Sequence, residues 1–221
     1  MPPEPIRVLL ADDEPEYRAT VRTLLEVTAG VEVVAEAATG RAACDLAARH
    51  PVDVAVLDVR MPDLDGIAAT RRITALPGGP RVLILTTFDL DAAVYETLRA
   101  GASGFLLKDV PPPRLVDAIR TVAAGEALLA PTVTRRLIAD FLRAPTRPHR
   151  PLDGVTARER EVLTLITRGL SNAEIEEALH LSRHTVKTHI GHLKAKLSTR
   201  DRAQLVIAGY EAGLADDRPA P

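Results

Sequence analysis

The chain has 221 residues, of which 46% are hydrophobic, and its formal net charge is -2. At about 100–200 residues per domain, this length suits one or two domains with substantial cores. The near-neutral balance does not point to a nucleic-acid partner, so charge has to be examined locally. The single cysteine, Cys44, excludes a disulfide framework within the chain. No apolar run reaches the roughly 18 residues of a membrane span, and no signal peptide is evident, so we expect a cytoplasmic protein.

Residues 1–125 alternate short apolar runs with longer helical patterns. The apolar runs are rich in Val, Ile and Leu, which is typical of strands buried on both faces of a parallel sheet. Five such units predict an α/β doubly wound (βα)5 domain with right-handed crossovers and a ligand site beyond the carboxyl ends of the strands. The expected strands are Ile6–Ala11, 31–35, 52–57, 82–86 and Gly104–Leu107, and the expected helices are 15–27, 40–49, 65–76, 90–100 and 112–124.

Residues 126–151 are expected to link this domain to a second one. A helical pattern at 132–142 is followed by a stretch, 143–151, that carries three prolines and three arginines. Such a composition resists packing and is typical of a linker.

Residues 152–214 are helical in pattern and predict a small all-α domain of four helices, with a polar tail at 215–221. Two capping boxes, a third capping residue and a fourth helical run mark where the helices begin. The capping boxes begin at Thr156 and Ser171, the third cap is Ser182, and the fourth helix spans about 200 to 212.

Polar residues stand at the ends of four of the expected strands. Asp12 and Asp13 follow the first strand, Asp58 follows the third, Thr86 ends the fourth and Lys108 follows the fifth. A parallel sheet brings these ends to one edge, where three carboxylates would repel one another unless a hard cation such as Mg²⁺ relieved the repulsion. A single Asp at a strand end more often caps the following helix, but the whole set of residues favours a metal and phosphoryl site.

The chemistry that this set supports is phosphoryl transfer to a carboxylate. Ionised Asp58 would attack the phosphorus of a phosphohistidine or a small phosphodonor and form an acyl phosphate. Lys108 would pair with one phosphoryl oxygen, and the Thr86 hydroxyl would donate to another. The added charge and acceptors can pull a loop inward, which is how phosphorylation commonly acts as a switch.

The order and spacing of these residues resemble the receiver (CheY-like) domain of two-component systems over about 1–125. The resemblance implies that Asp58 is the phosphoacceptor and that Asp12 and Asp13 help to hold Mg²⁺. Asp58 and the backbone carbonyl of Arg60 would be further ligands. The resemblance also places Phe105 at an aromatic switch position, although a plain core aromatic remains an alternative.

The second domain contains a basic segment, although the chain as a whole is nearly neutral. Residues 153–177 carry three positive and six negative side chains, whereas residues 182–202 carry six positive and one negative. Such local density attracts phosphates. Within that segment Lys187, Gly191 and Lys194 share one face of a helix, opposite an apolar stripe. Together with the preceding helix and a short turn, this predicts a helix-turn-helix, whereas an ordinary bundle with a solvated basic face is the alternative.

The residues at 163, 169–175, 181–190 and 196–197 resemble the LuxR-type output domain, and its union with a receiver resembles the NarL/FixJ family of response regulators. The family resemblance implies that Lys187, Thr188 and the Gly191 position face base edges. It places another set nearer the phosphates: Thr185, His189 and Lys196. Glu176 departs from the small residue usual at its position, and Gly191 offers no side chain for reading bases.

We therefore expect a response regulator in which phosphorylation of Asp58 by a partner histidine kinase controls dimerisation and binding to two-part DNA sites. It would be no enzyme beyond slow self-dephosphorylation. The alternatives are a phosphoaspartyl hydrolase and a DNA-binding regulator with a vestigial receiver. The fourth helix is our candidate dimer surface, with core packing in the monomer as the alternative, through Ala203, Val206, Ile207 and Tyr210.

Overall fold

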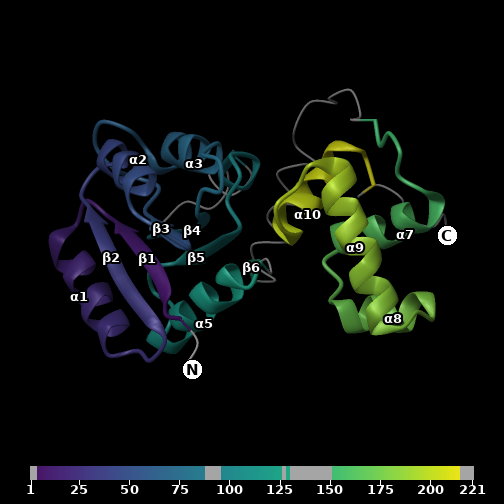
Figure 1. Cartoon of the computed structure of the whole chain (residues 1–221), viewed down its shortest axis with the longest axis horizontal. Helices are drawn as coiled ribbons and strands as arrows, with labels where there is room; N and C mark the ends of the chain where they lie inside the picture. Colours follow the sequence, from purple (N-terminus) through teal and green to yellow (C-terminus); the bar gives the residue numbers. More distant parts are fainter. Residues whose placement is uncertain (1–3, 88–95, 126–127, 130–150, 215–221) are drawn as a thin grey trace.

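The computed structural model describes residues 4–87, 96–125, 128–129 and 151–214. The first part forms a parallel sheet with the strand order β2-β1-β3-β4-β5-β6 (Figure 1). The strands are β1 (Ile6–Ala11), β2 (Val31–Ala37), β3 (Val54–Leu57), β4 (Arg81–Thr86), β5 (Gly104–Leu107) and the short β6 (Leu128–Leu129). The five predicted strands are confirmed, and β6, which the sequence did not predict, extends the sheet at its β5 edge.

Helices cover both faces of the sheet, as expected for a doubly wound fold. The receiver helices are α1 (Pro15–Glu26), α2 (Gly40–Arg49), α3 (Gly66–Thr74) and α5 (Pro112–Ala123). Alternate residues of β1 divide between the two layers: Val8 and Leu10 pack in the cluster that contains Val21 of α1, whereas Leu9 packs with Ala43 of α2. The predicted helix at 90–100 falls largely outside the described residues.

The output domain consists of α7 (Ala157–Thr167), α8 (Asn172–Leu179), α9 (Arg183–Leu197) and α10 (Arg202–Glu211). Both predicted capping boxes are present. The side chains of Thr156 and Ser171 each accept a hydrogen bond from the backbone amide three residues on, and the glutamate at that position accepts one from the backbone amide of the capping residue. Ser182 caps α9 in the same way, by accepting from the backbone of Thr185. The predicted helix at 132–142 and the tail at 215–221 lie outside the described residues.

The two domains pack against each other in this structure. One hydrophobic cluster includes both Phe105 of β5 and Ile207 of α10. Figure 1 shows α10 on the side of the output domain that is turned toward the receiver. Among the described helices, none combines the length and apolar character that crossing a bilayer requires.

Candidate functional site

The carboxyl edge of the sheet gathers an acidic pocket around one lysine. The Nζ atom of Lys108 lies 2.8 Å from Asp12 Oδ2 and 2.9 Å from Asp58 Oδ2. These three side chains are at most 6% exposed, so water screens their charges little. The structure thus brings Asp58 together with Asp12, 46 positions before it, and with Lys108, 50 positions after it, as the parallel-sheet prediction required.

Backbone hydrogen bonds fix the strand ends that carry these residues. The Asp58 amide donates to the Ala11 carbonyl at 2.9 Å, and the Lys108 amide donates to the Thr86 carbonyl at 2.8 Å. Thr86 itself is 2% exposed at the end of β4. Its position beside Lys108 is compatible with donating to a phosphoryl group, and that role stays a prediction.

Glu14 is a member of this pocket that the sequence analysis did not identify. Its Oε1 atom lies 3.0 Å from Lys108 Nζ, although the Glu14 side chain is 60% exposed. Glu14 occupies the N-cap position of α1 but makes no side-chain capping bond, so its carboxylate is free to reach the lysine. Carboxylate oxygens of Asp12, Glu14 and Asp58 all lie within 4.8 Å of one another, whereas the exposed Asp13 is not part of this group.

Burial and charge act against each other in the pocket. Burial raises the pKa of Asp12, and its bonds to Lys108 and to the Glu14 amide offset only part of this effect. Burial would lower the pKa of Lys108, but its hydrogen bonds to Asp12, Asp58 and Glu14 outweigh it and the pKa is raised. The ring of Tyr17 lies 4.5 Å from Lys108 Nζ, and burial raises the Tyr17 pKa to about 12, so the phenol stays neutral.

The oxygen ligands of this pocket fit a hard divalent cation. Mg²⁺ is usually held by one or two carboxylates with waters and phosphate oxygens. The cluster of Asp12, Glu14 and Asp58 supplies donors of this kind. The predicted roles of Asp13 and of the Arg60 carbonyl as ligands stay predictions.

The loop after β3 is folded tightly around Asp58. A Cβ atom on Gly66 would lie 2.0 Å from the Asp58 carbonyl oxygen, so only glycine fits there. The Gly66 amide donates to the Val59 carbonyl at 2.8 Å, and Asp65 caps α3 by accepting from Ala68 at 2.7 Å. The sequence pattern around Asp58 therefore serves a close approach of the loop backbone to the acceptor residue.

Phe105 is fully buried in β5, with 0% of its surface exposed. It packs in the cluster that includes Ile84 of the neighbouring strand β4 and Leu57 of β3. The structure therefore shows a core aromatic, and a switching movement of this ring stays a prediction.

The predicted reading surface lies on α9, the second helix of a helix-turn-helix. The helices α8 and α9 are joined by a short turn in which His180 has a left-handed φ of 51°. Lys187, Thr188 and Gly191 are exposed on α9. The Thr188 hydroxyl donates its proton to the His184 carbonyl at 3.0 Å, so the hydroxyl oxygen remains available to a ligand only as an acceptor.

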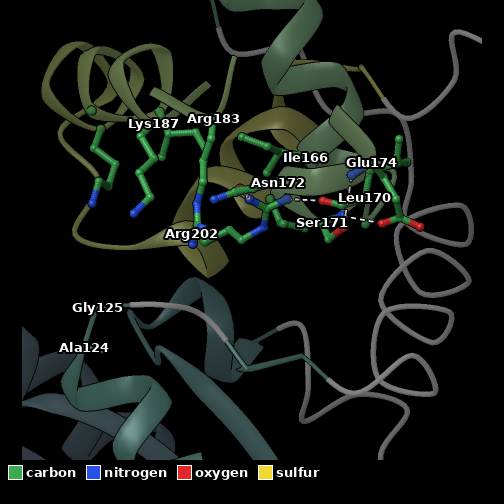
Figure 2. Close-up of a pocket in the computed structure, with 15 residues that line it drawn as sticks. Ala124, Gly125, Ile166, Leu170, Ser171, Asn172, Glu174, Arg183, Lys187 and Arg202 are labelled. Carbon is green, nitrogen blue, oxygen red and sulfur yellow. Dashed lines mark hydrogen bonds between the residues drawn. The ribbon is translucent and has the colours of Figure 1, made fainter. Parts of the chain in front are cut away.

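A hollow of about 700 Å³ separates this surface from the receiver. In Figure 2 the side chains of Arg183 and Lys187 extend toward the side on which Ala124 and Gly125 of the receiver lie. Gly191 and Lys194 of α9 and Asn172 and Arg202 of the other helices line the same hollow. Residues predicted to read bases therefore face the receiver in this arrangement.

Two of the side chains predicted to contact phosphates already bond other residues of this chain. Lys196 Nζ lies 2.7 Å from Oε2 of the buried Glu159, so a contact with DNA would require it to leave or share this ion pair. The Thr185 hydroxyl bonds the Ser182 hydroxyl at 2.8 Å. The buried Nδ1 atom of His189 has no hydrogen-bond partner among the described residues.

The fourth helix is packed within the single chain, and its role as a dimer surface stays a prediction. Its proposed dimer residues are buried within the single chain, with exposed fractions between 0% and 5%: Ala203, Val206, Ile207 and Tyr210. A helix with one apolar stripe can bury it either in its own domain or against another molecule, and here the stripe belongs to the core. These residues present no free dimer surface in the arrangement described.

Polar contacts hold α10 and its approach against the receiver. The Gln204 side chain donates to the carbonyl oxygens of Leu98 and Ala102, at 2.8 and 3.0 Å. Arg200 donates to the carbonyl oxygen of Thr74, the last residue of α3, at 3.3 Å, where a cation is favoured by the helix dipole. Sequence reasoning found neither residue, because docking between domains leaves no periodic signal.

Known proteins share both halves of this architecture. A family model for the response regulator receiver domain matches residues 8–120, and a model for bacterial regulatory proteins of the luxR family matches residues 153–208. The chain belongs to the response regulators of this two-domain type. The predicted family and fold class are confirmed: this response regulator carries a receiver domain and a LuxR-type DNA-binding domain.

The alignments with several relatives cover nearly the whole of both chains. This response regulator is 38% identical to an uncharacterised transcriptional regulatory protein, YxjL, of Bacillus subtilis, over 95% of this chain and 97% of the relative. It is 40% identical to a probable transcriptional regulatory protein, NarL, of Mycobacterium tuberculosis, over 97% and 98%. The crystal structure of the response regulator ChrA of a heme-sensing two-component system matches with a TM-score of 0.52 and 37% identity, over 96% of this chain and all of that one (100%).

Proposed function

We propose that Mg²⁺-dependent phosphorylation of Asp58 by a partner histidine kinase controls dimerisation and sequence-specific DNA binding, and so regulates transcription. The supporting observation is that one chain joins the pocket of Lys108 and Asp58 to a reading helix that faces the receiver. The protein would act in the cytoplasm. It would be a phosphoacceptor and not a catalyst of turnover, with at most slow self-dephosphorylation.

The chemistry uses Asp58 as the nucleophile. A carboxylate oxygen forms a bond to phosphorus as the bond between phosphorus and the donor breaks, and the electron pair of that bond leaves with the donor. A bound Mg²⁺ would neutralise charge on the phosphoryl group. Lys108 then exchanges its contact with the Asp58 carboxylate, 2.9 Å in this structure, for one with a phosphoryl oxygen.

Strand β5 provides a short path from this pocket to α10. The strand is four residues long, and Lys108 follows its C-terminal end. At its other end Ala102, two residues before the strand, accepts a hydrogen bond from Gln204. Movement of Lys108 toward a phosphoryl group would displace one end of this strand, and the contact at the other end would weaken.

The proposed switch is a shift between two populations. The docked form keeps α10 on the receiver and the reading helix turned toward it, and the released form is free to dimerise and bind DNA. Phosphorylation can shift this equilibrium only if it stabilises the released form relative to the docked form. A modification that changes the free energy of both forms equally leaves their populations unchanged. Release would also be needed for α10 to contribute to a dimer.

The test compares unmodified protein with Asp58→Asn, each with and without acetyl phosphate and Mg²⁺, by footprinting across genomic DNA. We expect the phosphodonor to strengthen protection of two-part sites only when Asp58 is present. Equal footprints with and without phosphodonor would favour a vestigial receiver. Continued hydrolysis of acetyl phosphate, well beyond one equivalent per chain, would favour a hydrolase.

A further inference from the structure

Gly191 stands in the interior of the reading helix without a structural reason. It lies within α9 (Arg183–Leu197), and a Cβ atom built on it meets no atom of the residues that the structure describes within 4 Å. Its backbone has no positive φ, so the helix there suits any residue. The described fold therefore does not require glycine at this position.

Other glycines of the chain show what a structural requirement looks like. A Cβ on Gly209 of α10 would lie 1.8 Å from the Thr167 hydroxyl oxygen of α7. The helices α10 and α7 pack at that point, so any side chain on Gly209 would force them apart. Gly66 is confined in the same way by the Asp58 carbonyl. Gly191 differs from both, because its surroundings are open.

A glycine inside a helix also weakens the helix. Relative to alanine it lowers the folding equilibrium constant by about two- to five-fold, because the unfolded chain has more freedom to lose. No atom of the described residues lies close enough, within 4 Å, to offset this cost at Gly191. The receiver does not explain it either, since Ala124 and Gly125 line the far side of the hollow and lie beyond that distance.

The surroundings of Gly191 favour an anionic partner. Lys187 and Lys194 lie four residues before and three residues after it, so all three share one helix face. Arg183 lines the same hollow. A position without a side chain, set between cations on an exposed helix, suits close approach to a surface that carries phosphates on both sides, which is the form of a DNA groove.

We propose that Gly191 determines DNA specificity: its missing side chain lets the α9 backbone lie against a base-pair edge, between Lys187 and Lys194. This inference rests on the proposed DNA-binding function. Even one added methyl group would hold the helix away from the base edge. Phosphate contacts through long lysine side chains would adjust, whereas the fit to a specific base pair would not.

Two variants of the phosphorylated full-length protein test this. A preferred site is first selected from a random duplex library with unmodified protein. Gly191→Ala should unfold at a higher urea concentration, yet bind the selected site at least about five-fold more weakly, as for a mismatched base pair. Its affinity for scrambled DNA should change less than about two-fold, because that binding depends on phosphates.

Gly191→Lys distinguishes an essential close approach from a merely empty surface. An added cation normally strengthens binding to all DNA and steepens the salt dependence by about one unit. We expect it to strengthen binding to scrambled DNA while weakening binding to the selected site. If both variants keep the affinity and the preferred sequence of unmodified protein, the role of Gly191 is refuted. If unmodified protein selects no sequence at all, the proposed function itself fails.

Discussion

The side chain of Gln204 donates to the main-chain carbonyl of Leu98 at 2.8 Å, across the boundary between the two domains and 106 positions along the chain. A second bond from the same amide nitrogen reaches the Ala102 carbonyl at 3.0 Å. One side chain thus satisfies two acceptors on the segment that leads into β5. Because α10 is the helix that carries Gln204, its separation from the receiver must break both bonds.

Replacing Gln204 with leucine should favour the released form. The substitution keeps a similar volume but removes the donors, and leaving the two carbonyls without their partner costs roughly 1–3 kcal/mol in the docked form. We expect unphosphorylated Gln204→Leu to bind DNA about five-fold or more tightly than unphosphorylated unmodified protein, measured by fluorescence anisotropy. The phosphorylated forms should bind alike. An equal affinity of the two unphosphorylated proteins would show that this contact does not restrain DNA binding.

Removal of Lys108 should make the protein unusually dependent on Mg²⁺. Lys108→Met leaves Asp12 and Asp58 buried without their cation, and such a loss typically costs about 3 kcal/mol. Mg²⁺ would replace the missing charge, so it should raise the urea midpoint more in this variant than in unmodified protein. Lys187→Met, which removes an exposed ammonium, is the control. Equal stabilisation of all three proteins by Mg²⁺ would contradict our description of the pocket.

Glu14 should slow phosphorylation by small anionic donors. Its carboxylate adds negative charge beside Asp58 and competes for Lys108, although its exposure limits the effect through solvent screening. Glutamine removes this charge but keeps a carbonyl oxygen as a donor for Mg²⁺. We expect Glu14→Gln to accumulate phosphorylated protein about two- to five-fold faster with acetyl phosphate, followed by intact-protein mass spectrometry. Glu16→Gln, an exposed acid two residues along, should behave as unmodified protein does. Identical rates for both variants would remove Glu14 from the account of the site.

The ion pair of Glu159 should make the output domain sensitive to acid. Lys196 and the Thr156 amide lower the pKa of Glu159 to about 2, below its value in the unfolded chain. The unfolded chain then binds the proton more readily, so the contribution is full above about pH 4.5 and is lost as the pH falls toward 2. Glu159→Gln should cost about 1–2 kcal/mol at neutral pH in urea unfolding.

The difference between Glu159→Gln and unmodified protein should shrink across that acidic range. Glu161→Gln on the same helix, an exposed acid, is the matched control and should change little. A difference that stays constant from pH 7 to pH 3 would mean that the charge on Glu159 contributes nothing.

Much of the site could be predicted because a parallel sheet converts order along the chain into position in space. Asp12, Asp58 and Lys108 each follow a strand directly, so the topology alone brings them together. Glu14 could not be predicted in the same way. Its contact with Lys108 depends on an N-cap side chain that leaves its own helix uncapped, and no periodic pattern reports that choice.

In the output domain, sequence patterns predicted the local structure but not the packing of α10 or the contacts between the domains. The capping boxes at Thr156 and Ser171 were predictable because they depend on residues three positions apart. The apolar stripe of α10 was ambiguous, since the same spacing serves a monomer core or a dimer surface. The contacts of Arg200 and Gln204 with the receiver could not be predicted from the sequence, because their partners are backbone carbonyls, which every residue possesses.

The most direct test of the central claim is hydrogen exchange on the full chain with Mg²⁺, before and after acetyl phosphate. Phosphorylation of Asp58 is expected to release α10 from the receiver. Peptides covering residues 97–103 and 200–211 should therefore lose protection as the phosphorylated mass appears, and Asp58→Asn should show no change. Complete phosphorylation of Asp58 without a change in either peptide would contradict the account.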